Sequence, residues 1–147
     1  MTDAITTSLY ELEAGQVTMA HPYAARVVEE LPEYSWTSKP ASMGRLVASV
    51  MQNDRIELEV RVAGKPAALA VVVSEQDDHV GPCLSVQWLY TLPEHRGKGY
   101  TESLLQIVKR LAVQLHIPTI AYTRRVGDIV GGVQYQLTYR RVYGKVD

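Results

Sequence analysis

The sequence contains no phenylalanine, one cysteine and no long apolar run. The single cysteine, Cys83, excludes an intramolecular disulfide and fits a reducing compartment. No apolar run approaches the roughly 18 residues that a membrane-spanning helix needs. The N-terminal residues M-T-D-A-I-T-T-S lack the basic segment and apolar core of a signal peptide. These absences predict a cytoplasmic protein with no membrane partner.

The basic and acidic residues are unevenly distributed along the chain. Residues 1–94 carry six Lys and Arg against thirteen Asp and Glu, a net charge of −7, whereas residues 95–147 carry nine against three, a net +6. This is either ordinary scatter of solvated charge or a C-terminal half that faces a polyanionic small molecule. The basic residues are neither dense nor interleaved with aromatic residues, so we expect no nucleic-acid partner. The four histidines are scattered and form no metal-ligand set, so we expect no metal.

The chain of 147 residues, 46% of them hydrophobic and 21% charged, is expected to form one globular domain over residues 1–147. Hydrophobic periodicity predicts helices at 23–31, from Ala41 or Ser42 to Met51, and at 100–115. It predicts strands at 6–12, 56–62, 67–73, 83–91, 119–123 and 133–142. The segments 33–40, 75–81 and 125–132 are predicted as loops. The order is β-α-α-β-β-β-α-β-β, which indicates an α+β (or α/β) fold. The unit 83–123 requires a parallel strand pair with a right-handed crossover.

The central feature of the sequence is a strand, a basic glycine turn and a helix. Val86 to Leu92 is an apolar strand, Pro93 ends it, and Arg96-Gly97-Lys98-Gly99 precedes a helical pattern that continues to Pro118. The first backbone N–H groups of a helix lack internal partners and carry partial positive charge. Glycines allow a ligand to approach the backbone closely. Such a turn suits a diphosphate.

This stretch resembles the GNAT superfamily of N-acetyltransferases, whose pattern Arg/Gln-x-x-Gly-x-Gly/Ala falls here on residues 96–101. Pro93-Glu94-His95 also resembles the family's lead-in to that loop. The resemblance covers residues 5–124 in element order and is sharp over 86–115. It implies a mixed, mostly antiparallel sheet with a central parallel strand pair. It also implies transfer of an acetyl group from acetyl-CoA to a primary amine of a small molecule or protein.

The same resemblance implies the roles of particular residues. The pyrophosphate would be held by the loop Arg96, Gly97, Lys98, Gly99, Tyr100 and Thr101. Main-chain groups of Leu89, Tyr90 and Thr91 would pair with the pantetheine arm. Tyr34 and Trp36 lie in the segment that usually borders the acceptor site, where packing is the equal alternative.

Two departures from the family pattern concern the chemistry. Thr101 replaces the last Gly or Ala of the motif. Only 24 residues follow Thr123, so the family's fourth helix must be short or absent. In the family that helix often carries an Asn that touches the cofactor and a Tyr that protonates the thiolate, and neither is in place here. Tyr135 and Tyr139 are the candidates to replace that Tyr, unless they only fill a core without Phe. His95 is either a general base or a solvated neighbour of the loop.

Two functions therefore remain open. The first is an acetyl-CoA-dependent N-acetyltransferase. The second is a catalytically inactive GNAT-like structural or interaction module, similar to shortened GNAT-like proteins of tailed bacteriophages and then located in a virion. The long last strand has an edge that favours a homo-oligomer or packing in a larger assembly.

Overall fold

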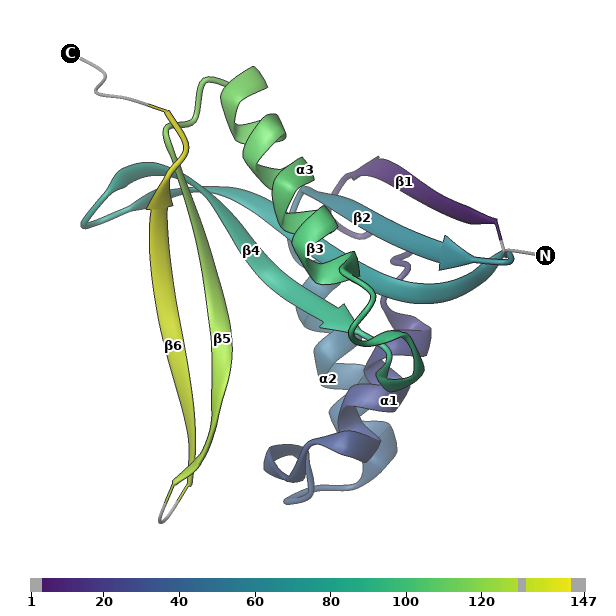
Figure 1. The fold of residues 1–147 in the computed structure, drawn as a ribbon. Helices are drawn as coiled ribbons and strands as arrows, with labels where there is room; N and C mark the ends of the chain where they lie inside the picture. The colour runs from purple at the N-terminus through teal and green to yellow at the C-terminus, as the bar shows by residue number, and fades with distance from the viewer. Residues whose placement is uncertain (1–3, 130–131, 144–147) are drawn as a thin grey trace.

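The strand and helix patterns form one six-stranded sheet with helices on both faces (Figure 1). The structure is a computed structural model that describes residues 4–129 and 132–143. The spatial order of the strands equals their order in the chain. All neighbouring strands are antiparallel except β4 and β5, which are parallel. The strands are β1 (Ile5–Leu12), β2 (Arg55–Val62), β3 (Lys65–Asp77), β4 (Gly81–Thr91), β5 (Thr119–Ile129) and β6 (Gly132–Arg141).

Helix α3 (Tyr100–Gln114) covers one face of the sheet, and helices α1 (His21–Glu30) and α2 (Lys39–Met51) cover the other (Figure 1). Leu104, Val108 and Ala112 recur along one side of α3 and are buried in a core with residues of β2, β3, β4 and β5. Tyr23 of α1 and Val50 of α2 are buried in the second core. Two short 3-10 helices, η1 (Pro32–Tyr34) and η2 (Pro93–His95), follow α1 and β4.

The predicted elements are all present, but the bounds of several are wrong, most of all at β3, β4, α2 and β5. Strands β3 and β4 continue through most of the predicted loop 75–81, so that Asp77 pairs with Gly81 across a tight turn. Helix α2 begins at Lys39, where Ser38 caps it by accepting a hydrogen bond from the Ala41 N–H. The predicted glycine-rich connection 125–132 is mostly strand, because β5 continues to Ile129 and β6 begins at Gly132. Strand β5 thus leads into β6 with no helix among the described residues.

Strands β4 and β5 pair over a short length and then separate (Figure 1). The pairing joins Cys83–Val86 to Thr119–Tyr122 only, although both strands continue well beyond it. Between the pairs Val72–Val86 and Val71–Trp88 the register shifts, which leaves Gln87 as an extra residue on β4. A bulge of this kind bends its strand. The bulge lies where the strands part, and a wedge opens between the end of β4 and the β5–β6 hairpin.

Candidate active site

The loop before α3 has the backbone geometry of an anion-binding turn. Gly97 and Gly99 have φ values of 78° and 80°, in the left-handed region that residues with a Cβ rarely adopt. A Cβ built at either glycine would have no heavy atom within 4 Å, so the space in front of the loop is open. Gly99 is the N-cap of α3 and no side chain caps this helix. The first-turn N–H groups are therefore available to an anion.

An open pocket of about 600 Å³ lies in front of this turn. Thr101, at the last motif position, lines the pocket, and its hydroxyl lies 2.9 Å from the Thr91 hydroxyl at the end of β4. Lys98 does not belong to the lining. The residues that line the pocket are Leu89, Tyr90, Thr91, His95, Arg96, Gly97, Gly99, Tyr100, Thr101 and Glu102.

The end of β4 presents main-chain groups to the wedge. The Leu92 N–H donates to the carbonyl of Ala67, on β3, at 2.9 Å. Because the direction of main-chain groups alternates along a strand, those of Leu89 and Thr91 point away from β3 and into the wedge. The Thr91 carbonyl already accepts a hydrogen bond from Arg96 Nε at 3.1 Å. Of the predicted residues Leu89, Tyr90 and Thr91, only Leu89 therefore presents both its main-chain N–H and its C=O to the wedge.

A second pocket of about 540 Å³ occupies the wedge itself. It adjoins the first one, because Leu89, Tyr90 and Arg96 line both. Its walls come from α1, η1, β4, β5 and β6, and they include four aromatic side chains. The lining is Val27, Glu30, Leu31, Tyr34, Gln87, Trp88, Leu89, Tyr90, Arg96, Thr123, Arg125 and Tyr135.

One carboxylate–arginine–tyrosine cluster lies where the two pockets meet. Arg96 of the motif donates through Nη2 to both oxygens of Glu30, at 2.7 and 2.9 Å. The Tyr90 hydroxyl donates to the same carboxylate at 3.0 Å, and the guanidinium lies 5.4 Å from the Tyr90 ring centre. Burial, followed by this hydrogen bond and the charge of Glu30, raises the pKa of Tyr90 to about 12.

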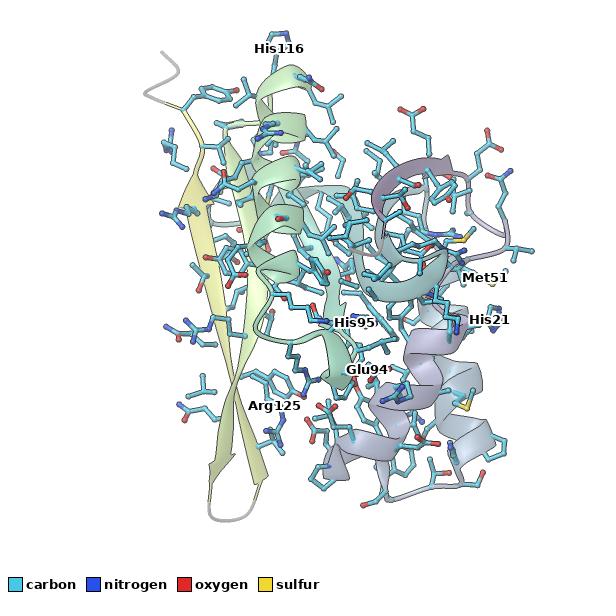
Figure 2. The ribbon with its side chains drawn as sticks, turned by 45° about the vertical axis from the view of Figure 1, so that its right-hand side comes forward. His21, Met51, Glu94, His95, His116 and Arg125 are labelled. Carbon is cyan, nitrogen blue, oxygen red and sulfur yellow. The ribbon has the colours of Figure 1, made fainter. Side chains whose placement is uncertain are left out.

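A second cluster of the same composition closes the other side of the wedge. Arg125 of β5 donates through Nε to Glu33 at 3.1 Å, and the Tyr135 hydroxyl donates to the same carboxylate. Figure 2 shows Arg125 in the gap between the β5–β6 hairpin and the helices. Burial and Glu33 raise the pKa of Tyr135 to about 12. Burial opposes ionisation of Glu33, but the hydrogen bonds from Arg125 and Tyr135 prevail and lower its pKa.

Comparison with known proteins places this arrangement in a family. The sequence profile of the Acetyltransferase (GNAT) family matches residues 8–129. The chain belongs to the GNAT family. No curated protein sequence matches the chain. The match extends over β1 through β5 and includes the whole of the glycine turn, α3 and both sides of the wedge except Tyr135.

Solved GNAT structures share the fold at low sequence identity. The ribosomal-protein-S18-alanine N-acetyltransferase of Escherichia coli is 13% identical, with a TM-score of 0.66 and 97% of each chain covered. A ribosomal-protein-alanine N-acetyltransferase of Brucella melitensis is 18% identical, with a TM-score of 0.58 and 81% and 79% covered. An aminoglycoside N-acetyltransferase solved in complex with CoA is 13% identical, with a TM-score of 0.55 and 83% and 78% covered.

Besides Lys98, two of the predicted site residues, Trp36 and Tyr139, line neither pocket. The Tyr139 hydroxyl donates to Asp77 Oδ2 at 2.8 Å, next to the β3–β4 turn, and Tyr139 lines neither pocket. Trp36 is 72% exposed and stacks with Arg45, whose Cζ lies 4.7 Å from the ring centre. Tyr34 and Tyr135, by contrast, line the wedge pocket together.

His95 is the histidine at the GNAT loop, and it lines the first pocket. Its Nδ1 is buried with no hydrogen-bond partner in the described part of the chain, and its ring centre lies 6.2 Å from that of Tyr100. Figure 2 shows His95 at the start of α3, with His116 at the other end and His21 on α1. Within residues 4–129 and 132–143, no group of three His, Cys, Asp or Glu side chains could hold a metal ion. No helix among these residues is long and apolar enough to cross a membrane.

Sequence patterns did not indicate Glu30, Glu33, Arg125, Gln87 or Trp88 as site residues. Glu30 is separated from Arg96 by 66 positions, and Glu33 from Arg125 by 92. Each carboxylate stands at the end of an amphipathic helix or in the turn after it, where a solvated acidic residue is ordinary. Their role follows only from the fold, which brings the end of α1 to the wedge.

Proposed function

We propose that the protein is an acetyl-CoA-dependent N-acetyltransferase that acts on a primary amine of a small molecule or a protein. The observation that carries the proposal is that the two pockets are adjacent and share Leu89, Tyr90 and Arg96 in their linings. An anion-binding turn at one end and an aromatic-lined wedge at the other suit a long cosubstrate with a diphosphate and a separate acceptor.

The residues at the turn fit acetyl-CoA on structural grounds. Two left-handed glycines leave open space in front of the uncapped first turn of α3, which is where a diphosphate would accept hydrogen bonds. Leu89 offers main-chain groups to the amides of a pantetheine arm. Bound acetyl-CoA would supply an acyl thioester to be attacked by the amine.

The protein's own groups would then position the amine and hold protons. The aromatic side chains of Trp88, Tyr90 and Tyr34 line the wedge and would pack against the acceptor. Tyr135 Oη keeps its proton up to a pH of about 12 and is the candidate proton donor to a departing thiolate. Glu30 lies where the two pockets meet, and its carboxylate would bind an ammonium group only in exchange for Arg96, which now donates to both of its oxygens.

Binding is tested by titrating acetyl-CoA into the wild-type protein and into Gly99→Glu. A carboxylate within about 4 Å of a diphosphate costs roughly 1–4 kcal/mol. We therefore expect the dissociation constant to rise at least about fivefold. Gly64→Glu is the matched control, because Gly64 has a φ of +75° with open space around it, and it lies in the β2–β3 turn. Undiminished binding by Gly99→Glu would mean that the diphosphate site lies elsewhere.

Catalysis is tested by following thiol release from acetyl-CoA with a panel of small amines and of peptides with free N-termini. Two of the structural relatives are named as N-acetyltransferases of ribosomal-protein alanine, so peptides that begin with alanine belong in the panel. Thiol release that depends on one amine class supports the proposal and identifies the acceptor. No release with any amine, despite binding, contradicts it.

The second candidate is a GNAT-like module that binds acetyl-CoA or a partner without catalysis, as in a virion-associated protein. The observation in its favour is that both carboxylates of the wedge are engaged by arginines and tyrosines. A proton transfer from a phenol of pKa about 12 to a thiolate of ordinary pKa about 8.5 is uphill by about 5 kcal/mol. The N-acetyltransferase would be cytoplasmic, and the inactive module would be found in a virion.

A further inference from the structure

Strand β6 is the last strand of the sheet, and no described strand pairs with its outer side. Natural edge strands are usually protected by charges, proline or short length. Strand β6 is ten residues long, and from Val133 to Tyr139 it contains neither a charged residue nor a proline. Three large side chains of β6 are exposed to solvent, to 48% at Tyr135, 55% at Leu137 and 36% at Tyr139.

The same three residues present their main-chain groups to the open side. The Val142 N–H donates to the Pro118 carbonyl at 2.8 Å, in register with the β5–β6 ladder. Even-numbered residues of β6 therefore point their main-chain groups toward β5, and odd-numbered residues point theirs outward. Tyr135, Leu137 and Tyr139 thus combine unpaired N–H and C=O groups with apolar side chains on one face of the sheet.

We propose that two copies of the chain pair through β6 in antiparallel orientation, with Leu137 opposite Leu137 of the second copy. The sequence of residues 135–139 is Tyr-Gln-Leu-Thr-Tyr, which is symmetric about Leu137 in its apolar and polar positions. In this register Tyr135 lies opposite Tyr139 of the second copy. A twofold interface requires such self-complementarity.

The proposed register also satisfies hydrogen bonding and charge. Odd-numbered residues lie opposite odd-numbered residues, so every outward N–H and C=O meets a partner. Arg140 and Arg141 lie opposite the uncharged Gln134 and Val133 of the second copy, so no like charges are opposed. Two Tyr–Tyr pairs and one Leu–Leu pair gather on one face.

The tyrosine side chains are held in place before pairing. Tyr135 donates to Glu33 and Tyr139 donates to Asp77. Side chains that are already ordered lose little conformational entropy on association. Tyr135 also lines the wedge pocket, so Tyr139 of the second copy would stand beside the wall of that pocket. A symmetric edge favours a second copy over an unrelated peptide strand, which would need no such symmetry.

The first test is light scattering of the full chain during size-exclusion chromatography. We expect a dimer for the wild type. Leu137→Lys places two like charges opposite each other and should raise the dimer dissociation constant at least about tenfold. Val126→Lys is the matched control, because Val126 is 52% exposed on β5 and adds the same charge away from the pairing edge. A monomeric wild type, or a dimer that Leu137→Lys does not weaken, overturns the proposal.

The second test fixes the register and does not depend on the charge variant folding. Residues opposite each other in a hydrogen-bonded antiparallel pair have Cα atoms about 5.5 Å apart, within disulfide range. Leu137→Cys should therefore give a disulfide-linked dimer under mild oxidation, whereas Gln136→Cys should not. Both variants retain the buried Cys83, so they share one background. Crosslinking of Gln136→Cys alone, or of neither variant, overturns the proposed register. Neither test uses acetyl-CoA, so the result is independent of the proposed function.

Discussion

Tyr23→Phe removes one hydroxyl from the centre of the core under α1. Tyr23 is fully buried, and its hydroxyl donates to Glu59 Oε2 at 2.9 Å and lies 3.2 Å from the Ala68 carbonyl oxygen. Glu59 is 1% exposed, and its other oxygen accepts from Arg61 Nε at 2.9 Å. The substitution keeps the ring in place and deletes one of the two side-chain partners of a buried carboxylate.

The expected cost follows from that geometry. A hydrogen bond to a charged group contributes about 1.5–3 kcal/mol, and no large cavity is added because only an oxygen atom is removed. We expect the free energy of unfolding to fall by about 2 kcal/mol. For a domain of this size that loss lowers the Tm by roughly 4–10 °C.

The pH dependence of this difference has a defined sign. Burial, followed by the charge of Glu59, raises the pKa of Tyr23 well above its usual value near 10. A group whose folded-state pKa is raised contributes its full stability below the unfolded-state pKa and loses it as the pH rises toward the folded-state pKa. The difference between the wild type and Tyr23→Phe should therefore be constant up to about pH 10 and shrink above it.

Urea denaturation followed by circular dichroism measures the effect. Tyr10→Phe is the control, because Tyr10 is half-buried on β1 and its hydroxyl makes no hydrogen bond within the described structure. We expect Tyr10→Phe to lie within about 0.5 kcal/mol of the wild type. If Tyr23→Phe is no less stable than Tyr10→Phe, the buried Tyr23–Glu59 hydrogen bond does not stabilise the fold and the reasoning fails.

Two further predictions concern the wedge and the loop. Tyr135→Phe should lower kcat about 10²-fold or more while leaving acetyl-CoA affinity unchanged, and a rate loss from Tyr135 ionisation should set in only as the pH approaches its pKa of about 12. An unchanged kcat would exclude Tyr135 as proton donor. The bidentate hydrogen bond from Arg26 lowers the pKa of Glu94 to about 2. The pair therefore stabilises the fold fully above the ordinary pKa of a glutamate, and this stability is lost as the pH falls toward 2. In Arg26→Ala the Glu94 pKa should rise toward the ordinary carboxyl range in an NMR titration, although a backbone hydrogen bond still lowers it, and a value still near 2 would contradict this assignment.

The sequence predicted the order and the class of the elements, because each element has its own periodicity. Apolar and charged residues alternate strictly over 56–62, which indicates strand β2 and places Glu57 and Glu59 together on its charged face. Both carboxylates are buried, at 0% and 1% exposure. Glu57 accepts hydrogen bonds from Arg55 and Thr18, and Glu59 from Tyr23 and Arg61. Alternation reports which residues share a face, and only tertiary structure reports what covers that face.

The glycine turn could be predicted because its chemistry is contiguous in sequence. Two left-handed glycines, a strand and a helix start are local features, and residues 96–101 adopt that geometry. The wedge pocket could not be predicted in the same way. Its two clusters join α1 and η1 to a loop and a hairpin that lie far along the chain. In addition, the glycines of residues 125–132 indicate a loop, whereas β5 continues through Gly127 as a strand.

The two clusters explain why the wedge has a definite shape. Glu30 with Arg96 and Tyr90, and Glu33 with Arg125 and Tyr135, tie one short segment to both sides of the gap. The Arg96–Glu30 side chains are 47% and 28% exposed, and such ion pairs contribute only about 0–1 kcal/mol to stability. Their main effect is therefore on position. Because the segment from the end of α1 through η1 is held to the glycine turn by Arg96 and to the β5–β6 hairpin by Arg125 and Tyr135, the same short segment fixes the position of both sides of the wedge.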